Sequence, residues 1–129
     1  MNYVLDTHVL LWWTLDPEKL SPAAKEILKN YESNSISISS ISIWELGIKQ
    51  KRKKLDIGMT IEKYTENLKN MGSIKIVPID EKIWIKNLSL DWDNADPADR
   101  TIVATASLSS SIMISKDEKI SEFYKNTVW

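Results

Sequence analysis

Short apolar runs alternate along this chain with longer segments whose apolar residues recur at helical spacing. The short runs are rich in Ile and Val and end in polar turns, a pattern typical of buried strands. They predict strands at Tyr3–Leu5, Ser35–Ser39, Ile74–Val77 and Ile112–Ser115, with a further short strand at Thr127–Trp129.

The longer segments carry apolar residues on one face and are bounded by residues that start or stop helices. Ser21 with Pro22, Thr60 and Asp80 are typical N-caps, and Gly72 is placed to end a helix. The predicted helices are His8–Leu15, Ala23–Tyr31, one from about Ile41 that carries Ile41, Trp44 and Ile48 at helical spacing, Ile61–Met71, Glu81–Leu88, Ala98–Leu108 and Glu118–Tyr124.

Strands that alternate with helices predict right-handed crossovers and a parallel sheet with helices on both faces. We therefore expect an α/β protein, a three-layer α/β/α sandwich that forms one domain over residues 1–129. Ligands of such folds bind outside the carboxyl ends of the strands, so that edge is where functional side chains are expected.

Charge and composition narrow the function classes without naming one. The 17 basic and 18 acidic residues give a net charge of -1, so any contact with nucleic acid must be local. The absence of Cys excludes disulfides, iron–sulfur clusters and Cys-ligated zinc. The first residues lack the basic start of a signal peptide, and the apolar run Val9–Trp13 is too short to span a membrane. We expect a cytoplasmic protein.

Four acidic residues are predicted to meet at the carboxyl edge of the sheet. Asp6 follows the first strand, Glu45 lies early in the helix after the second, Asp99 opens the Ala-rich helix, and Asp117 follows the fourth strand. Carboxylates held together repel one another, and a divalent cation relieves this repulsion. Oxygen-only ligands favour Mg²⁺ or Mn²⁺, and such sites hydrolyse phosphodiester bonds by in-line displacement.

The segments that carry these acids also resemble a known family along nearly the whole chain. DTHVLLW at residues 6–12, SIWE at 42–45, DPADRTIVATA at 96–106 and SKD at 115–117 are similar, in order and spacing, to the motifs of VapC-type PIN-domain toxins. The resemblance implies the toxin of a type II toxin–antitoxin pair. Such a toxin is an endoribonuclease that cleaves RNA with Mg²⁺ or Mn²⁺ and is silenced by a VapB-like antitoxin.

The same resemblance implies homodimers and the strand order 3-2-1-4-5, with the first and fourth strands side by side. Carried over by position, Asp6 and Asp99 are implied as direct metal ligands, and Glu45 and Asp117 complete the acidic quartet. One departure concerns Asn94, which stands where members with a related central motif often have His. No histidine role is expected at that position.

Several of these residues also have purely structural interpretations. Asp96 precedes Pro97 as an ideal N-cap, and contact with the metal or its water is the alternative. Ser42-x-x-Glu45 is also a helix capping box, and Asp80 is expected to cap. His8 follows Asp6 closely but is interpreted as a surface or capping contact, outside catalysis.

Contact with RNA is predicted for Thr7, Arg100, Ser115 and Lys116. Ordinary turn bonding is the alternative for Thr7 and Ser115, and Arg100 is interpreted as either a surface ion pair or a backbone clamp. The basic run Lys49–Lys54 is either a solvated helix face or a phosphate contact. The tryptophans are interpreted as core and dimer-interface residues rather than base-stacking platforms; they are Trp12, Trp13, Trp44, Trp84, Trp92 and Trp129.

Two other functions compete with the ribonuclease. A phosphoacceptor receiver domain has similar length and class, but Asp6 is followed by Thr7 and His8 instead of a second acid, and only Lys116 matches. A catalytically silent PIN fold that binds an antitoxin or RNA is the second, and metal-dependent cleavage separates it from the enzyme. The RNA that is cut does not follow from the acids.

Overall fold

Five parallel strands form the central sheet in a computed structural model that describes residues 1–129. In chain order the strands are β1 (Asn2–Leu5), β2 (Ser35–Ser39), β3 (Ile74–Val77), β4 (Ile112–Ile114) and β5 (Thr127–Val128). Their order across the sheet is β3-β2-β1-β4-β5. The predicted fold class and strand order are therefore confirmed. This order differs from the 2-1-3-4-5 sheet of receiver domains, which excludes that alternative.

Seven α-helices connect the strands, close to where the sequence pattern places them. They are α1 (Thr7–Leu15), α2 (Pro22–Lys29), α3 (Ser40–Lys51), α4 (Ile61–Asn70), α5 (Glu81–Ser89), α6 (Pro97–Leu108) and α7 (Glu118–Phe123). The predicted N-caps Ser21, Thr60 and Asp80 each accept a backbone N–H bond at the start of α2, α4 and α5. Gly72 ends α4 with a positive φ of 90°, which glycine adopts without strain.

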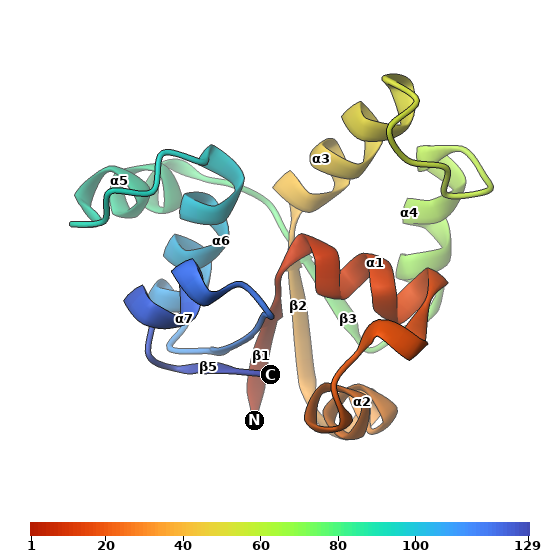
Figure 1. Cartoon of the computed structure of the whole chain (residues 1–129), viewed down its shortest axis with the longest axis horizontal. Helices are drawn as coiled ribbons and strands as arrows, with labels where there is room; N and C mark the ends of the chain where they lie inside the picture. The colour runs from red at the N-terminus through yellow and green to blue at the C-terminus, as the bar shows by residue number, and fades with distance from the viewer.

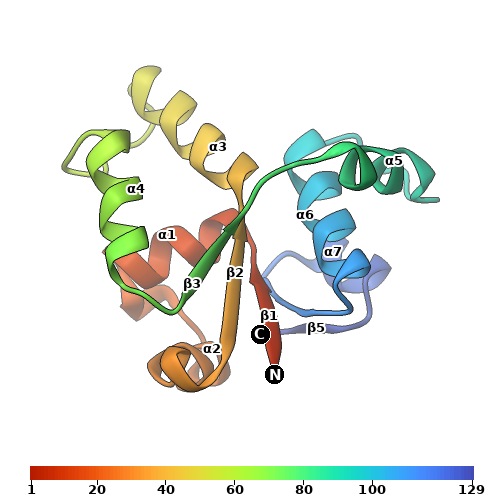
Figure 2. The same cartoon turned by 180° about the vertical axis from the view of Figure 1, so that it is seen from behind.

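The helices cover both faces of the sheet, α1–α4 on one side and α5–α7 on the other (Figure 1), and the reverse view in Figure 2 shows the same division. Each face has its own apolar cluster because side chains alternate along a strand. Tyr3 and Leu5 of β1 belong to the cluster under α1, α2 and α4, whereas Val4 points into the cluster under α6. The first strand is thus buried on both faces, as its continuous apolar run predicts.

Two local expectations about α3 are wrong. Ser39 caps this helix by accepting the N–H of Ile41, so Ser42 and Glu45 do not form a capping box. Trp44 shares the helical spacing of Ile41 but is 62% exposed, and it points away from the core. The apolar face of α3 is instead completed by Leu46, which is buried.

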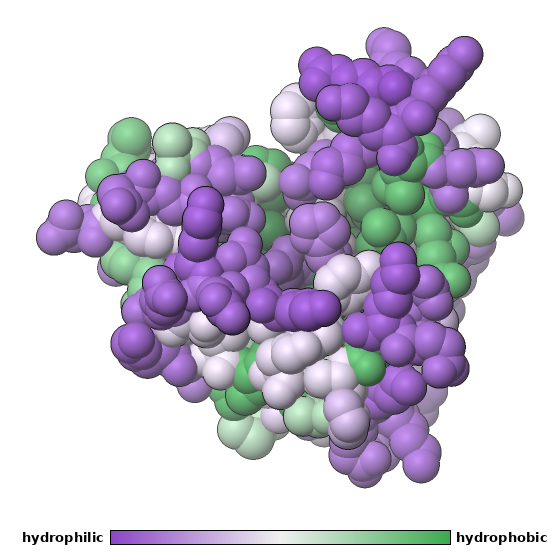
Figure 3. All heavy atoms as spheres, viewed as in Figure 1, coloured by the Kyte–Doolittle hydropathy of each residue, from purple (hydrophilic) through white to green (hydrophobic).

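The surface seen in Figure 3 is hollowed near its middle, between α6 and the α1–α3 side. Hydrophobic residues gather to the right of this hollow, between α1 and α4, where Trp13, Met59 and Leu68 help to line a cavity. No helix combines the length and the apolar composition that a membrane crossing requires.

A candidate active site at the carboxyl edge of the sheet

Asp6 lies at the end of β1 and is fixed by two hydrogen bonds. Its Oδ1 accepts the backbone N–H of His8 at 3.2 Å, which caps α1, and its Oδ2 accepts the Ser115 hydroxyl at 2.6 Å. Ser115, just beyond β4, also accepts the N–H of Asp117 at 3.0 Å. Because β1 and β4 are neighbours, a single buried serine joins Asp6 to the turn that carries Asp117.

Asp99 lies in the first turn of α6, where two neighbouring residues position it. Asp96 caps the helix and accepts the N–H groups of Ala98 and Asp99 at 2.9 and 3.1 Å. The side-chain amide of Asn94 donates to Asp99 Oδ2 at 3.0 Å. The N-cap interpretation of Asp96 is thus confirmed.

The surroundings of Asp99 disfavour its charge. Burial raises its pKa from 3.8 to about 6, the Asn94 hydrogen bond opposes the rise, and the negative charges of Asp96, Asp6 and Asp117 add to it. The last two of these acids come from different elements, β1 and the turn after β4. The fold therefore brings three of the four predicted acids into electrostatic contact, with an excess of negative charge.

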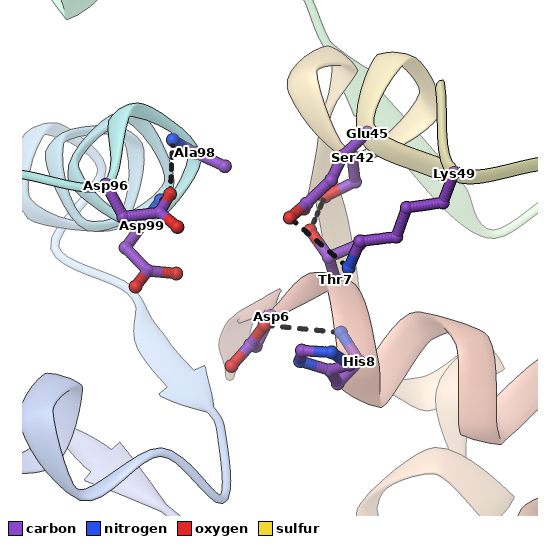
Figure 4. Close-up of polar contacts among 9 residues, drawn as sticks. All are labelled: Asp6, Thr7, His8, Ser42, Glu45, Lys49, Asp96, Ala98 and Asp99. Atoms are coloured by element: carbon purple, nitrogen blue, oxygen red, sulfur yellow. Dashed lines mark hydrogen bonds and ion pairs between the residues drawn. The ribbon is translucent and has the colours of Figure 1, made fainter. Parts of the chain in front are cut away.

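Glu45 faces the same space from α3, but its charged neighbour is different. Figure 4 shows the carboxylates of Asp6, Glu45 and Asp99 pointing from three elements into one space. Glu45 Oε2 lies 3.7 Å from Lys49 Nζ, one turn further along the helix. Glu45 is not among the charges that raise the pKa of Asp99, and its own charged partner is Lys49.

A divalent cation fits this set of side chains, with a limit on its direct ligands. No three His, Cys, Asp or Glu side chains are close enough together to hold one ion between them. Mg²⁺ commonly takes only one or two protein carboxylates and completes its shell with water. Burial is the main cause of the raised pKa of Asp99, and the charges of Asp96, Asp6 and Asp117 add to it; a cation would offset that repulsion, and the carboxylates offer it hard oxygen ligands.

Arg100 clamps the loop that precedes α6. Its guanidinium donates to the carbonyls of Asn87, Leu90, Trp92 and Asn94 and to the Asn87 side chain, at 2.6 to 3.2 Å. These five bonds use all five N–H donors of an arginine. The prediction that Arg100 contacts RNA is therefore wrong, because no donor is left for a phosphate. Arg100 instead fixes the backbone of Asn94, which orients Asp99.

The other predicted RNA contacts divide by burial. Thr7 and Ser115 are only 3% and 2% exposed, and their hydroxyls bind Ser42 Oγ and Asp6. Neither hydroxyl reaches the surface, so RNA contact is excluded for both and a positioning role replaces it. Lys116 is exposed, with its Nζ over the ring of Trp12 at 5.9 Å from the centroid.

Three polar residues of this network were not predicted as contributors. Asn94 orients Asp99, buried Asn87 joins Arg100 to Thr101 Oγ1, and Ser42 bonds to Thr7 across α3 and α1. Asn94 carried a sequence signal, since it occupies a position where similar motifs have another hydrogen-bonding side chain, and Ser42 belongs to the SIWE motif, but as a capping residue rather than as a partner of Thr7. Asn87 and Ser42 meet partners that are distant in the chain, which no local pattern reveals.

The basic run at the end of α3 splits into one paired and several free cations. Lys49 pairs with Glu45, whereas Lys51, Arg52, Lys53 and Lys54 are exposed and form no ion pair.

The six tryptophans fall into two groups according to their exposure. Trp44 and Trp84 are exposed, while the four that pack at least partly against the core are Trp12, Trp13, Trp92 and Trp129.

Residues 3–126 match the PIN domain family. The chain is also 25% identical over 118 residues to Ribonuclease VapC22 of Mycobacterium tuberculosis, an alignment that covers 91% of this chain and 88% of that protein.

Solved structures share the fold at lower identity. A toxin–antitoxin complex from Klebsiella pneumoniae contains a chain with a TM-score of 0.68 and 22% identity, covering 99% of this chain and 97% of that one. The complex VapBC2 from Rickettsia felis, bound to a DNA fragment from its promoter, gives 0.68 at 18% identity, with 99% and 96% covered.

Proposed function

The chain belongs to the PIN-domain family, as its motifs implied, and from this premise we propose that it is a divalent-metal-dependent endoribonuclease. Its relative is a ribonuclease by name, and the chains that share its fold were solved in toxin–antitoxin complexes. We extend the proposal to the biological role. The chain is the toxin of a type II pair, restrained by a VapB-like antitoxin protein.

The observation that carries the enzymatic proposal is the electrostatic state of Asp99. Its pKa of about 6 reflects burial together with three neighbouring acids, of which Asp6 and Asp117 come from other elements. A fold that only bound a protein partner would gain nothing from this repulsion, which costs stability. A cation-dependent hydrolase uses the same charge to hold its metal.

Each acid is assigned a part according to its surroundings. A bound Mg²⁺ or Mn²⁺ would polarise the RNA phosphate and lower the pKa of an attached water. Asp6 and Asp99 are the proposed direct ligands, and Ser115 and Asn94 hold these carboxylates in orientation. Asp117 and Glu45 are proposed to bind metal-attached water or a second ion, with Glu45 partly neutralised by Lys49.

Two further contacts are proposed, one with RNA phosphates and one with a second copy of the chain. The free cations Lys51 to Lys54 are a candidate contact for RNA phosphates away from the acids. Homodimer formation is a prediction from the family resemblance. Apolar residues suited to covering by a second copy are exposed on α5, where Trp84, Ile85 and Leu88 are 46%, 64% and 82% accessible.

Cleavage by the purified chain tests the enzymatic proposal. We expect a single-stranded RNA to be cut with Mg²⁺ or Mn²⁺ and to stay intact with EDTA. Asp6→Asn and Asp99→Asn should each lower the cleavage rate by about 10³-fold or more, since metal stabilisation is worth several kcal/mol. Asparagine still caps a helix, so Asp6→Asn keeps the start of α1.

The matched control is Asp91→Asn, which removes an exposed loop acid that makes no hydrogen bond. It should cleave at the wild-type rate. Cleavage that persists in both Asp6→Asn and Asp99→Asn, or that ignores EDTA, contradicts the site. A folded wild-type chain that cuts no RNA favours the silent binding module instead.

A further inference from the structure

An open cavity lies directly beside the acidic site, on the side of α1. It has a volume of about 340 Å³ and is lined by Asp6, His8, Trp12, Lys116 and Asp117. Two of these residues are acids of the proposed metal site, but the other three have no part in it. The walls therefore combine negative, aromatic and cationic groups within the space of one small ligand.

The aromatic wall is a pair of flat rings supported by the core. The His8 imidazole stacks on the Trp12 indole with centroids 5.8 Å apart and an interplanar angle of 29°. Trp12 is half-buried and rests against Trp129 at 5.8 Å, while His8 is exposed. Both rings line the cavity, so a flat base that enters it can stack against them.

The cationic wall is Lys116, which has no carboxylate partner. Its neighbours in the cavity include Asp6 and Asp117, yet no ion pair forms between Lys116 and either acid. The ammonium lies instead over the Trp12 ring, 5.9 Å from its centroid. A cation held by an aromatic face remains free to receive a phosphate.

We propose that this cavity binds one unpaired nucleotide of the RNA beside the bond to be cut. The base stacks on His8 and Trp12, the phosphate meets Lys116, and the acids hold the metal next to that phosphate. The inference rests on the proposed ribonuclease function and adds to it the residues that hold the nucleotide next to the metal site. A paired base is already stacked within its helix, so duplex RNA cannot fill the cavity.

Binding, measured apart from cleavage, tests the proposal. The probe is a short fluorescent oligoribonucleotide, single-stranded or annealed to its complement, and the readout is anisotropy in EDTA with wild-type chain. We expect the single strand to bind more tightly than the duplex. His8→Ala and Trp12→Leu should weaken single-strand binding by about 5- to 100-fold, the range for losing a base–aromatic stack, and leave duplex binding unchanged.

Matched variants separate stacking from charge and from folding. His8→Phe restores a ring and should bind within about twofold of wild type if stacking is the cause. Leu108→Ala removes an exposed apolar side chain at the end of α6, outside the cavity, and should change nothing. Lys116→Ala should weaken single strands and reduce the salt dependence of binding by about one phosphate contact, whereas Lys29→Ala on α2 should not.

The outcomes decide the proposal independently of the enzymatic one. It is overturned if wild type binds duplex as well as single strand or binds neither, or if folded His8→Ala and Trp12→Leu both bind single strands normally. In any of these cases metal-dependent cleavage by wild type would leave the ribonuclease proposal standing. Loss of stacking-dependent binding in the variants, together with no cleavage by wild type, would instead support the cavity and reject the enzyme.

Discussion

The two walls of the acidic site are built in different ways. On the α6 wall, Asp99 is partly buried, receives a neutral hydrogen bond from Asn94, and lies in a loop–helix junction that Arg100 clamps through five hydrogen bonds. On the α3 wall, Glu45 has a lysine 3.7 Å away on the same helix, and no neighbouring group donates a hydrogen bond to its carboxylate. The Asp99 carboxylate forms no ion pair, whereas the Glu45 carboxylate pairs with a lysine of its own helix.

This difference indicates that the two walls have different roles in metal binding and stability. Neutral hydrogen bonds fix Asp99 without neutralising it, so its charge stays available to a metal. The Glu45–Lys49 pair is a surface contact that forms and breaks at little cost, which suits a side chain that adjusts to substrate. The α6 wall should therefore determine stability and metal affinity, and the α3 wall should only modulate them.

The largest effect is expected from removing the clamp of the α6 wall. Arg100→Met leaves four partly buried carbonyls without this donor and should lower the free energy of unfolding by about 3 kcal/mol. Metal affinity should fall by about 10- to 100-fold, because Asn94 loses its support. Denaturant unfolding and titration calorimetry with Mn²⁺ measure the two quantities.

Arg52→Met is the matched control, since Arg52 is exposed at the end of α3 and forms no ion pair. It should change neither quantity. Arg100→Lys should recover only part of the loss, because an ammonium cannot reproduce the planar fork of the guanidinium. Equal effects of Arg100→Met and Arg52→Met would show that the α6 wall does not depend on its clamp.

A smaller effect is expected from pH. The pKa of Asp99 is about 6 in the folded chain and 3.8 in the unfolded one, so between these values the folded chain holds a proton that the unfolded chain has lost. Without metal, stability should therefore fall as pH rises from 3.8 through about 6. Asp99→Asn should remove this slope, and Glu45→Gln should retain it, in thermal unfolding followed by circular dichroism.

The same thermal unfolding measurement with added metal tests the role of Asp99 more specifically. At neutral pH, Mg²⁺ should raise the unfolding temperature of wild type and of Glu45→Gln. It should raise that of Asp99→Asn much less, because only the first two chains keep the Asp99 carboxylate. A pH slope that survives in Asp99→Asn would mean that another group carries the repulsion.

The smallest effect is expected from breaking the ion pair of the α3 wall. Lys49→Met should change the free energy of unfolding by no more than about 0.5 kcal/mol, as for other helical pairs one turn apart. It should tighten Mn²⁺ binding by roughly two- to threefold, since a nearby positive charge is removed. Lys51→Met, with no acid beside it, is the control, and weaker Mn²⁺ binding in Lys49→Met would contradict the modulating role.

Local chemistry was enough to predict most of the elements. Ser21, Thr60, Asp80 and Asp96 each cap the helix expected of them, because capping depends on a side chain and the backbone just beyond it. The apolar face of α3 was predicted less well. Spacing placed Trp44 with Ile41, but only the packing of neighbouring elements decides which residues of a helix the core accepts.

The sequence by itself determined the alternating fold, the order of the acids along the chain and their place at one edge of the sheet, since these follow from periodicity and from parallel strands. Only the tertiary structure decided their states. It placed Ser115, 109 positions away in the chain, in hydrogen-bonding contact with Asp6. It directed Arg100, a predicted RNA contact, to backbone carbonyls of its own chain, and it paired Glu45 with Lys49. Charge and hydrogen bonding act through space, so burial and distant partners, which the order of residues does not state, fixed what each acid can do.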